Sequence, residues 1–189
     1  MVIETVVTTL DQTGEPNFAA MGVVWGADTI TIRPFTNTRT HRNLVRSGEA
    51  VVNVTDNVLL FAQSALSRDR FEHVPARHVR GVVLKDTCSW REVVVETISD
   101  TTEPGGAPRR AEVVTRVVGS GEFRPFAGLC RAKHAVVEAS ILASRLRLIP
   151  LDEVARELEK LDALVEKTGG AEERDAMAFI RRYIARKTA

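Results

Sequence analysis

Short connections between segments rich in Val, Ile and Thr most constrain the fold of this chain. Three such segments lie near the N-terminus, and we expect β-strands at 2–10, 17–25 and 29–33. The turns between them, at 11–16 and 26–28, are too short for a parallel crossover, which needs about a dozen residues or more. The three strands are therefore predicted to form an antiparallel meander.

Three further strands complete the β-rich part of the chain, and we expect them at 50–55, 81–98 and 111–123. A short helix at 40–47, stopped by Gly48, leads into the first of them. The Pro- and Gly-rich stretch at 100–110 is predicted to be the mobile tip of a hairpin between the other two. Six antiparallel strands hide their edges most economically by closing into a small barrel.

Helical periodicity replaces strand periodicity in the last third of the chain. It predicts three amphipathic helices, of which the first ends at Pro150 and the second at Gly169-Gly170. A shorter apolar helix is predicted earlier, at 57–66. We therefore expect a mainly β fold with an α appendage. Residues 1–126 form the six-stranded antiparallel barrel, and residues 127–189 form a helical region that packs on the barrel or on a dimer.

The composition argues against several classes of partner. The chain carries 26 Lys and Arg against 25 Asp and Glu, so it has no general attraction to nucleic acid or anionic membranes. The longest stretch without charged side chains, 16–27, is too short to span a bilayer. The N-terminus has no basic region of the kind that begins a signal peptide. We expect a cytoplasmic protein with neither a nucleic-acid nor a membrane partner.

Familiar catalytic signatures are absent from the sequence, among them the P-loop, HExxH, GxSxG and GxGxxG. Cys88 and Cys130 are predicted to be small, reduced hydrophobic residues rather than nucleophiles. His73 and His78 lie in a polar stretch without the helical spacing of a metal site, so we expect surface histidines and no metal. The sequence therefore identifies no catalytic residue.

One segment has the features of an anion site: Arg33-Pro34-Phe35-Thr36-Asn37-Thr38-Arg39-Thr40-His41-Arg42-Asn43-Leu44. A predicted strand ends, hydroxyl side chains follow at alternate positions, and a helix begins at once. The unpaired N–H groups of a helix N-terminus suit a phosphate. Hydroxyl donors come from Thr36, Thr38 and Thr40, and charge comes from Arg33, Arg39 and Arg42. The alternative is a threonine-capped helix with solvated arginines, and the pattern leaves both open.

Small residues in the second predicted strand indicate a place where a flat ring could approach the backbone. Ala19-Ala20-Met21-Gly22 would expose N–H and C=O groups that can bind a polar ring edge. The alternative, which the residues alone favour, is close packing against a neighbouring strand. Asn53 interrupts an apolar run, and a buried amide at that position needs backbone or ligand partners.

Taken in order, four blocks of this sequence resemble the FMN-binding split barrel of the flavin reductase and flavoredoxin type. The first three are Ala-Met-Gly in the second strand, Thr-x-Thr-x-x-Asn-Leu at 38–44, and Val-Val-Asn-Val-Thr-Asp at 51–56. The fourth, Arg131-Ala132-Lys133-His134-Ala135-Val136-Val137-Glu138-Ala139 with Ala143-Ser144-Arg145-Leu146, is similar to an archaeal-type branch of unknown function. The resemblance covers about residues 2–148.

The resemblance implies a homodimer with FMN bound at the subunit interface. The phosphate would lie on Arg33, Thr36, Thr38 and Thr40, with Asn37 and Arg39 nearby. The isoalloxazine ring would lie along Ala20, Met21 and Gly22, with Asn53 next to its polar edge. Arg131 and Lys133 would reach a cofactor or substrate across the dimer, and the alternative for this pair is a solvated helix start.

Two positions depart from the family pattern. Ala20 stands where a proline is expected, and Phe126–Cys130 replaces a Phe-Asn pair before Arg131. The implied function is that of an FMN-dependent oxidoreductase similar to flavin reductases. Hydride would pass through the flavin N5 between a nicotinamide or deazaflavin donor and a small-molecule redox substrate. The alternative is a non-catalytic flavin-binding or protein-interaction module. An arginine-rich nucleic-acid surface disagrees with the neutral composition.

Overall fold

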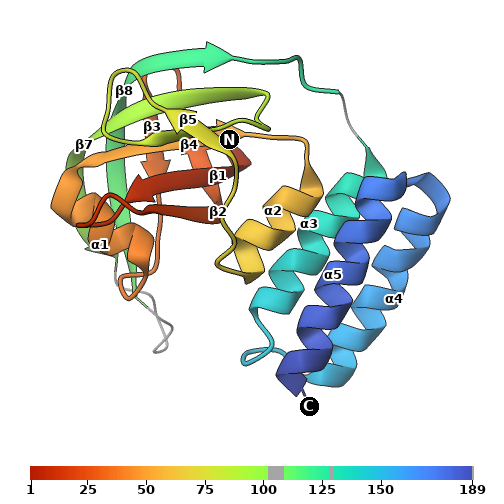
Figure 1. Cartoon of the computed structure of the whole chain (residues 1–189). Helices are drawn as coiled ribbons and strands as arrows, with labels where there is room; N and C mark the ends of the chain where they lie inside the picture. The colour runs from red at the N-terminus through yellow and green to blue at the C-terminus, as the bar shows by residue number, and fades with distance from the viewer. Residues whose placement is uncertain (102–108, 128–129, 189) are drawn as a thin grey trace. The chain divides into compact units, whose positions relative to one another are not determined.

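The computed structural model describes residues 1–101, 109–127 and 130–188, which form two compact units (Figure 1). The barrel unit comprises Met1–Thr55 with Arg70–Pro125, and the helical unit comprises Asp56–Asp69 with Phe126–Ala189. This division differs from the predicted one, because the segment 56–69 joins the C-terminal helices. Residues 102–108, which belong to the predicted hairpin tip at 100–110, and residues 128–129 lie outside the described residues.

Within the described residues, six antiparallel strands close into a barrel in the order β1-β2-β3-β8-β7-β4, which confirms the predicted fold class. The strands are β1 (Val2–Leu10), β2 (Pro16–Trp25), β3 (Thr29–Ile32), β4 (Glu49–Val54), β7 (Ser89–Thr101) and β8 (Arg110–Glu122). In the β1–β2 turn, the Asp11 carboxylate accepts the N–H groups of Thr13 and Glu15 at 2.8 and 3.0 Å. Gly14 supplies the left-handed residue with φ of 84°.

Odd-numbered residues of β1 and β2 point into the barrel, as the alternation of a strand requires. Val7 and Val23 belong to the enclosed apolar core together with Ile30, Ile32, Leu44, Ala50, Val52, Val93, Ala111 and Val113. Even-numbered residues face outward. Ala20 pairs with Val6, which pairs with Asn53, so these three residues form one row across β2, β1 and β4 on the outer face.

The predicted single strand at 81–98 is wrong, because the structure divides it into two elements. β6 (Val82–Leu84) pairs with β5 (His73–Pro75) in a separate two-stranded sheet, and β7 begins only at Ser89. Between them, the Thr87 hydroxyl donates to the Val54 carbonyl at 2.7 Å and to the Ser89 carbonyl at 2.9 Å. Such local side-chain bonds turn the backbone away from a continuous ladder.

The helix α1 (Arg39–Ser47) connects β3 to β4, close to its predicted bounds. Its buried residues Thr40, Asn43 and Leu44 face the barrel. It ends at Gly48, which has φ of 66° and donates its N–H to the Leu44 carbonyl at 2.9 Å. The barrel thus presents the N-terminal end of α1 directly after β3.

The described helical unit contains α2 (Val58–Leu66), α3 (Arg131–Ser144), α4 (Leu151–Thr168) and α5 (Ala171–Thr188), which pack together (Figure 1). Their shared core includes Ala62, Ala135, Val136, Leu158 and Ile180. The sequence of α2, VLLFAQSAL, is apolar on nearly every side and therefore needs to be buried among other helices. In the described part of the chain, no helix is long and apolar enough to cross a membrane.

Candidate functional site

The first turn of α1 is a helix end without an acidic side chain. Thr38 is its N-cap, and the Thr38 hydroxyl oxygen accepts the N–H of His41 at 3.3 Å. Among the described residues, no acceptor is found for the backbone N–H groups of Arg39 and Thr40. Asp or Glu near this position would balance the helix dipole, yet the first turn has neither and begins with Arg39. These features suit the binding of an anion.

The threonine hydroxyls of this segment already have hydrogen-bond partners within the barrel unit. The Thr36 hydroxyl donates to the Arg109 carbonyl at 3.2 Å, and the Thr38 hydroxyl donates to a carbonyl three residues earlier at 2.7 Å. Thr40 is buried and accepts a hydrogen bond from the Asn17 side chain at 3.1 Å. The threonine-capped helix of the alternative interpretation is therefore present. A phosphate contact from Thr36 or Thr38 requires its hydroxyl to rotate away from the carbonyl.

Two arginines that the sequence reasoning missed, Arg109 and Arg110, lie beside this helix end. Arg110 forms an isolated β-bridge with Phe35, and its guanidinium lies 4.3 Å from the centre of the Phe35 ring. Arg33 is also present, but it forms a two-pronged bond with the Glu112 carboxylate at 2.7 and 3.1 Å. The sequence shows this Arg-Arg pair just before a predicted strand, but only the pairing of β3 with β8 brings it to the start of α1.

A pocket of about 350 Å³ lies next to α1 and is lined by Asp11, Gln12, Arg39, Arg42, Asn43 and Arg46. We call it the arginine pocket. Hydrogen bonds from the side chain and backbone of Thr13, together with the Glu15 N–H and the Arg39 charge, hold the pKa of Asp11 below its usual value. Sequence reasoning included Arg39 and Arg42 but missed Arg46, which the helical spacing could have added.

The predicted ring-binding residues lie in one strand but not on one face. Met21 packs against the barrel core, whereas Ala20 and Gly22 alternate to the outer face. A Cβ on Gly22 would lie 2.8 Å from Cγ1 of Val2 and 3.1 Å from Oε1 of Glu4. Gly22 therefore permits the close strand packing of the alternative interpretation.

Asn53 is completely buried, and both ends of its amide are bonded within the barrel unit. Its Nδ2 donates to the Val6 carbonyl at 3.0 Å, and its Oδ1 accepts the Leu84 N–H at 3.0 Å. The side chain thus joins β1, β4 and β6. It satisfies the requirement for backbone partners that the sequence predicted for a buried amide at this position.

Arg131 and Lys133 lie in the helical unit, unlike the other predicted site residues. Arg131 is exposed at the first position of α3. The Lys133 ammonium donates to the Asp56 carbonyl and lies 3.5 Å from carboxylate oxygens of Glu172 and Glu173. In this structure Lys133 therefore neutralises acidic groups inside the helical unit.

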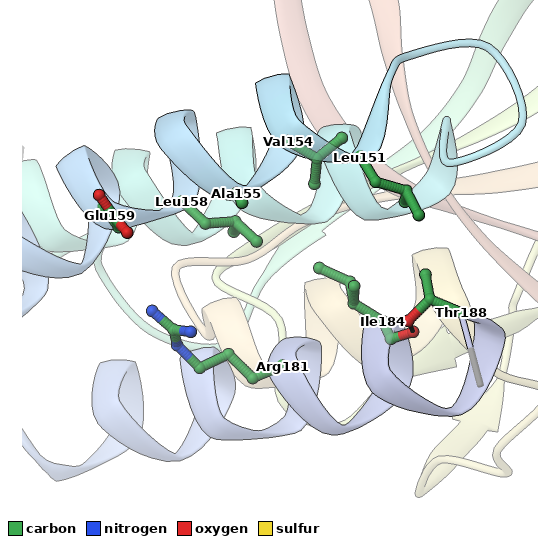
Figure 2. Close-up of a pocket in the computed structure, with 8 residues that line it drawn as sticks. All are labelled: Leu151, Val154, Ala155, Leu158, Glu159, Arg181, Ile184 and Thr188. Atoms are coloured by element: carbon green, nitrogen blue, oxygen red, sulfur yellow. Dashed lines mark hydrogen bonds between the residues drawn. The ribbon is translucent and has the colours of Figure 1, made fainter.

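A second pocket, of about 280 Å³, lies between α4 and α5 (Figure 2). Its lining is mostly apolar, and Figure 2 labels Leu151, Val154, Ala155, Leu158, Glu159, Arg181, Ile184 and Thr188. Arg181 already pairs with Asp162. In the portion that the structure describes, no cluster of His, Cys, Asp or Glu could hold a metal ion. The pocket between α4 and α5 therefore adds no catalytic group to the candidate site.

Two family models match nearly the whole chain. One, described as "Protein of unknown function (DUF447) N-terminal domain", matches residues 3–116. The other, described as "Protein of unknown function (DUF447)", matches residues 130–182. The two matches correspond broadly to the barrel and to the C-terminal helices.

Solved structures share the fold. An FMN-bound protein of the DUF447 family from Methanosarcina mazei is 23% identical with a TM-score of 0.79, covering 96% of this chain and 94% of its own. The 2-nitrobenzoate 2-nitroreductase of Pseudomonas fluorescens is 17% identical with a TM-score of 0.54, covering 64% of each chain. Nitrilotriacetate monooxygenase component B from Bacillus cereus is 17% identical with a TM-score of 0.53, covering 66% of this chain and 69% of its own.

Proposed function

This chain belongs to the DUF447 family, and from that premise we propose that it is a flavoprotein that binds FMN on the outside of its barrel. The similarity to an FMN-bound protein of the same family extends over both units, since it covers 96% of this chain. The observation in this structure that supports the proposal most directly is the acid-free N-terminus of α1, with two backbone N–H groups that have no acceptor among the described residues.

The residues present fit a flavin phosphate at this helix end. The backbone N–H groups of Arg39 and Thr40 would donate to phosphate oxygens, and the Thr36 and Thr38 hydroxyls would turn from their carbonyls to do the same. Arg109, whose carbonyl accepts the Thr36 N–H, would add a further cationic side chain near this helix end. The positive charges of Arg39 and Arg109 would compensate the negative charge of the phosphate without any change in the fold.

The outer face of β2 offers a surface for the flavin ring. Ala20 carries only a small side chain there, and a flat ring could approach Gly22 once the side chains of Val2 and Glu4, which lie against it, move aside. Asn53 lies in the same row as Ala20 but is bonded within the barrel, so we assign it a positioning role for β1 and β4. We also propose that FMN lies at the interface of a homodimer. Arg131 and Lys133 of a second subunit would then contact the cofactor or a substrate.

The proposed activity is oxidoreduction of a small molecule. When bound, FMN supplies hydride transfer chemistry, and the chain contributes binding, orientation and access. The alternative is flavin binding without turnover. Oxidation of NADH or NADPH by the FMN-loaded protein separates the two: steady turnover with an added acceptor supports the oxidoreductase, and a bound flavin that is never reduced contradicts it.

A titration with FMN and riboflavin tests the proposed site, because the two ligands differ only in the phosphate. We expect FMN to bind at least about 100-fold more tightly, as a phosphate with several charge-assisted hydrogen bonds would produce. The double variant Thr36→Val/Thr38→Val should weaken FMN binding about 10-fold or more and leave riboflavin binding unchanged.

The control is Thr29→Val, an exposed threonine on β3 away from the helix end. Thermal unfolding verifies that each variant is folded, since removal of the Thr38 cap costs about 1 kcal/mol of stability. Equal affinities for FMN and riboflavin would contradict the phosphate assignment. A protein that binds neither ligand would contradict flavin binding altogether.

A further inference from the structure

The arginine pocket carries a positive charge that the chain does not neutralise. Arg39, Arg42 and Arg46 contribute three cations, and Asp11 contributes the single carboxylate of the lining. The Asp11 Oδ1 already accepts the Thr13 N–H, the Thr13 hydroxyl and the Glu15 N–H at 2.7 to 3.0 Å. The pocket therefore has a surplus of about two positive charges at neutral pH.

The three arginines differ in this respect from other arginines of the barrel unit. Among the described residues, no carboxylate oxygen lies within 4.0 Å of their guanidinium nitrogens. Carboxylate partners are found for Arg33, Arg70, Arg80, Arg116 and Arg124. The three cations also share one face of a nine-residue helix, where like charges at this spacing destabilise one another. Arg46 lies in the last turn, where a cation interacts favourably with the helix dipole, but the placement of Arg39 and Arg42 has no such explanation in the stability of α1.

Two of the guanidinium groups are held in position by the backbone. Arg42 donates to the Asn37 carbonyl at 2.9 Å, and Arg46 donates to the Leu10 carbonyl. Each of these bonds uses one of the five N–H donors of an arginine, so several remain for a ligand. The exposed amide of Gln12 adds a neutral donor to the lining. Anchoring of this kind lowers the entropy lost when an anion binds.

We propose that the arginine pocket binds the phosphate monoester of a small phosphorylated molecule other than the flavin. A phosphate monoester carries a charge of about −1.5 to −2 at pH 7, which matches the surplus of the pocket. Guanidinium groups bind phosphate oxygens through paired hydrogen bonds. A volume of about 350 Å³ admits a phosphate with part of an attached sugar. The proposal does not depend on flavin binding, because its main ligands are the side chains of Arg42 and Arg46 rather than the backbone N–H groups at the start of α1.

Isothermal titration calorimetry of the full chain, with and without FMN, tests this site. The probes are inorganic phosphate, adenosine 2′-monophosphate and uncharged adenosine. The variant is Arg42→Gln/Arg46→Gln, which keeps helix-forming residues and removes two cations. The matched control is Arg70→Gln/Arg80→Gln, which removes two exposed, carboxylate-paired cations from the same unit.

We expect saturable binding of adenosine 2′-monophosphate, no binding of adenosine, and a loss of about 30-fold or more in the pocket variant but less than about threefold in the control. Saturation by inorganic phosphate alone would assign the pocket to free phosphate as the source of the same group. Equal binding by the two double variants would overturn the proposal. An equal loss of FMN affinity in the pocket variant would also overturn it, by assigning the pocket to the flavin.

Discussion

The substitution His41→Glu separates the helix end as a binding site from the helix end as a structural cap. His41 is the third residue of α1, and its N–H is already bonded to the Thr38 side chain. A carboxylate in the first turn interacts favourably with the helix dipole, so the variant should gain about 0.3–1 kcal/mol in the free energy of unfolding. If the end of α1 had no ligand, this gain would be the only consequence.

If a phosphate binds at this helix end, the same carboxylate that stabilises the fold should weaken the binding of FMN. The new carboxylate would lie roughly 7 Å from the phosphate, somewhat more than the 5.4 Å of one helical turn. With an effective dielectric constant between about 20 and 80, each unit of charge is repelled by about 0.6–2.4 kcal/mol. For a phosphate of about −1.5 to −2 charges, a middle value near 2 kcal/mol weakens FMN binding about 30-fold.

Two assays on the same samples decide the matter. Urea denaturation should show equal or higher stability for His41→Glu, and fluorescence titration should show weaker binding of FMN but not of riboflavin. His41→Gln is the control, because it removes the ring without adding charge. We expect its FMN affinity to stay within about twofold of the parent protein's and its free energy of unfolding to be unchanged. An FMN affinity that is the same in both variants would refute the placement of the phosphate at α1.

Further predictions concern groups outside the helix end. Burial raises the pKa of Glu92, but hydrogen bonds from the backbone N–H groups of His78 and Arg77 lower it below its ordinary 4.5. The stability that Glu92 contributes should therefore be complete above pH 4.5 and decline as the pH falls through the lowered pKa. This decline should be missing in Glu92→Gln. At neutral pH, urea denaturation should show that variant to be about 2–3 kcal/mol less stable than the parent protein. Gly22→Val should lose about 1–3 kcal/mol in the same assay, because its Cβ would lie 2.8 Å from Val2, and an undiminished stability would contradict the packing. Lys133→Met should lower the melting temperature by leaving the buried Glu173 without its cation, and an FMN titration of the folded variant tests its predicted cofactor contact.

The extent of the barrel could be predicted because its strands are long and its turns carry clear signals. β1 was predicted at its observed bounds, since a nine-residue segment with seven Val, Ile and Thr residues runs into an Asp-containing turn. β5 and β6 have three residues each, which is too short for any periodicity to be recognised. They form because Asn53 bonds to Leu84 and the Glu92 carboxylate holds the N–H of Val79 at 3.2 Å, and both contacts depend on tertiary structure.

The candidate site was predictable where its residues are adjacent in the chain and not where distant segments meet. The threonine-rich helix start and its cap follow from local sequence, and the structure contains them. Arg109 reaches the same place only through the pairing of β3 with β8, about 70 residues later in the chain. The bond between Arg33 and Glu112 depends on the same pairing, and it converts an expected phosphate ligand into half of an ion pair.

The proposed phosphate site at the start of α1 and the arginine pocket both place positive charge on one short helix, and the barrel can tolerate the cost of that charge. A cation at the first helical position opposes the dipole, and three arginines on one face repel one another, at a combined cost of about 1–2 kcal/mol. The buried side chains of Thr40, Asn43 and Leu44 fix the helix against the barrel and offset that cost. A bound anion relieves the repulsion and stabilises the folded state by an amount that rises with the logarithm of its concentration relative to its Kd. The helix end and the arginine pocket should therefore each add to the melting temperature with their own ligand, and the two increments should be close to additive if the two phosphates are held separately.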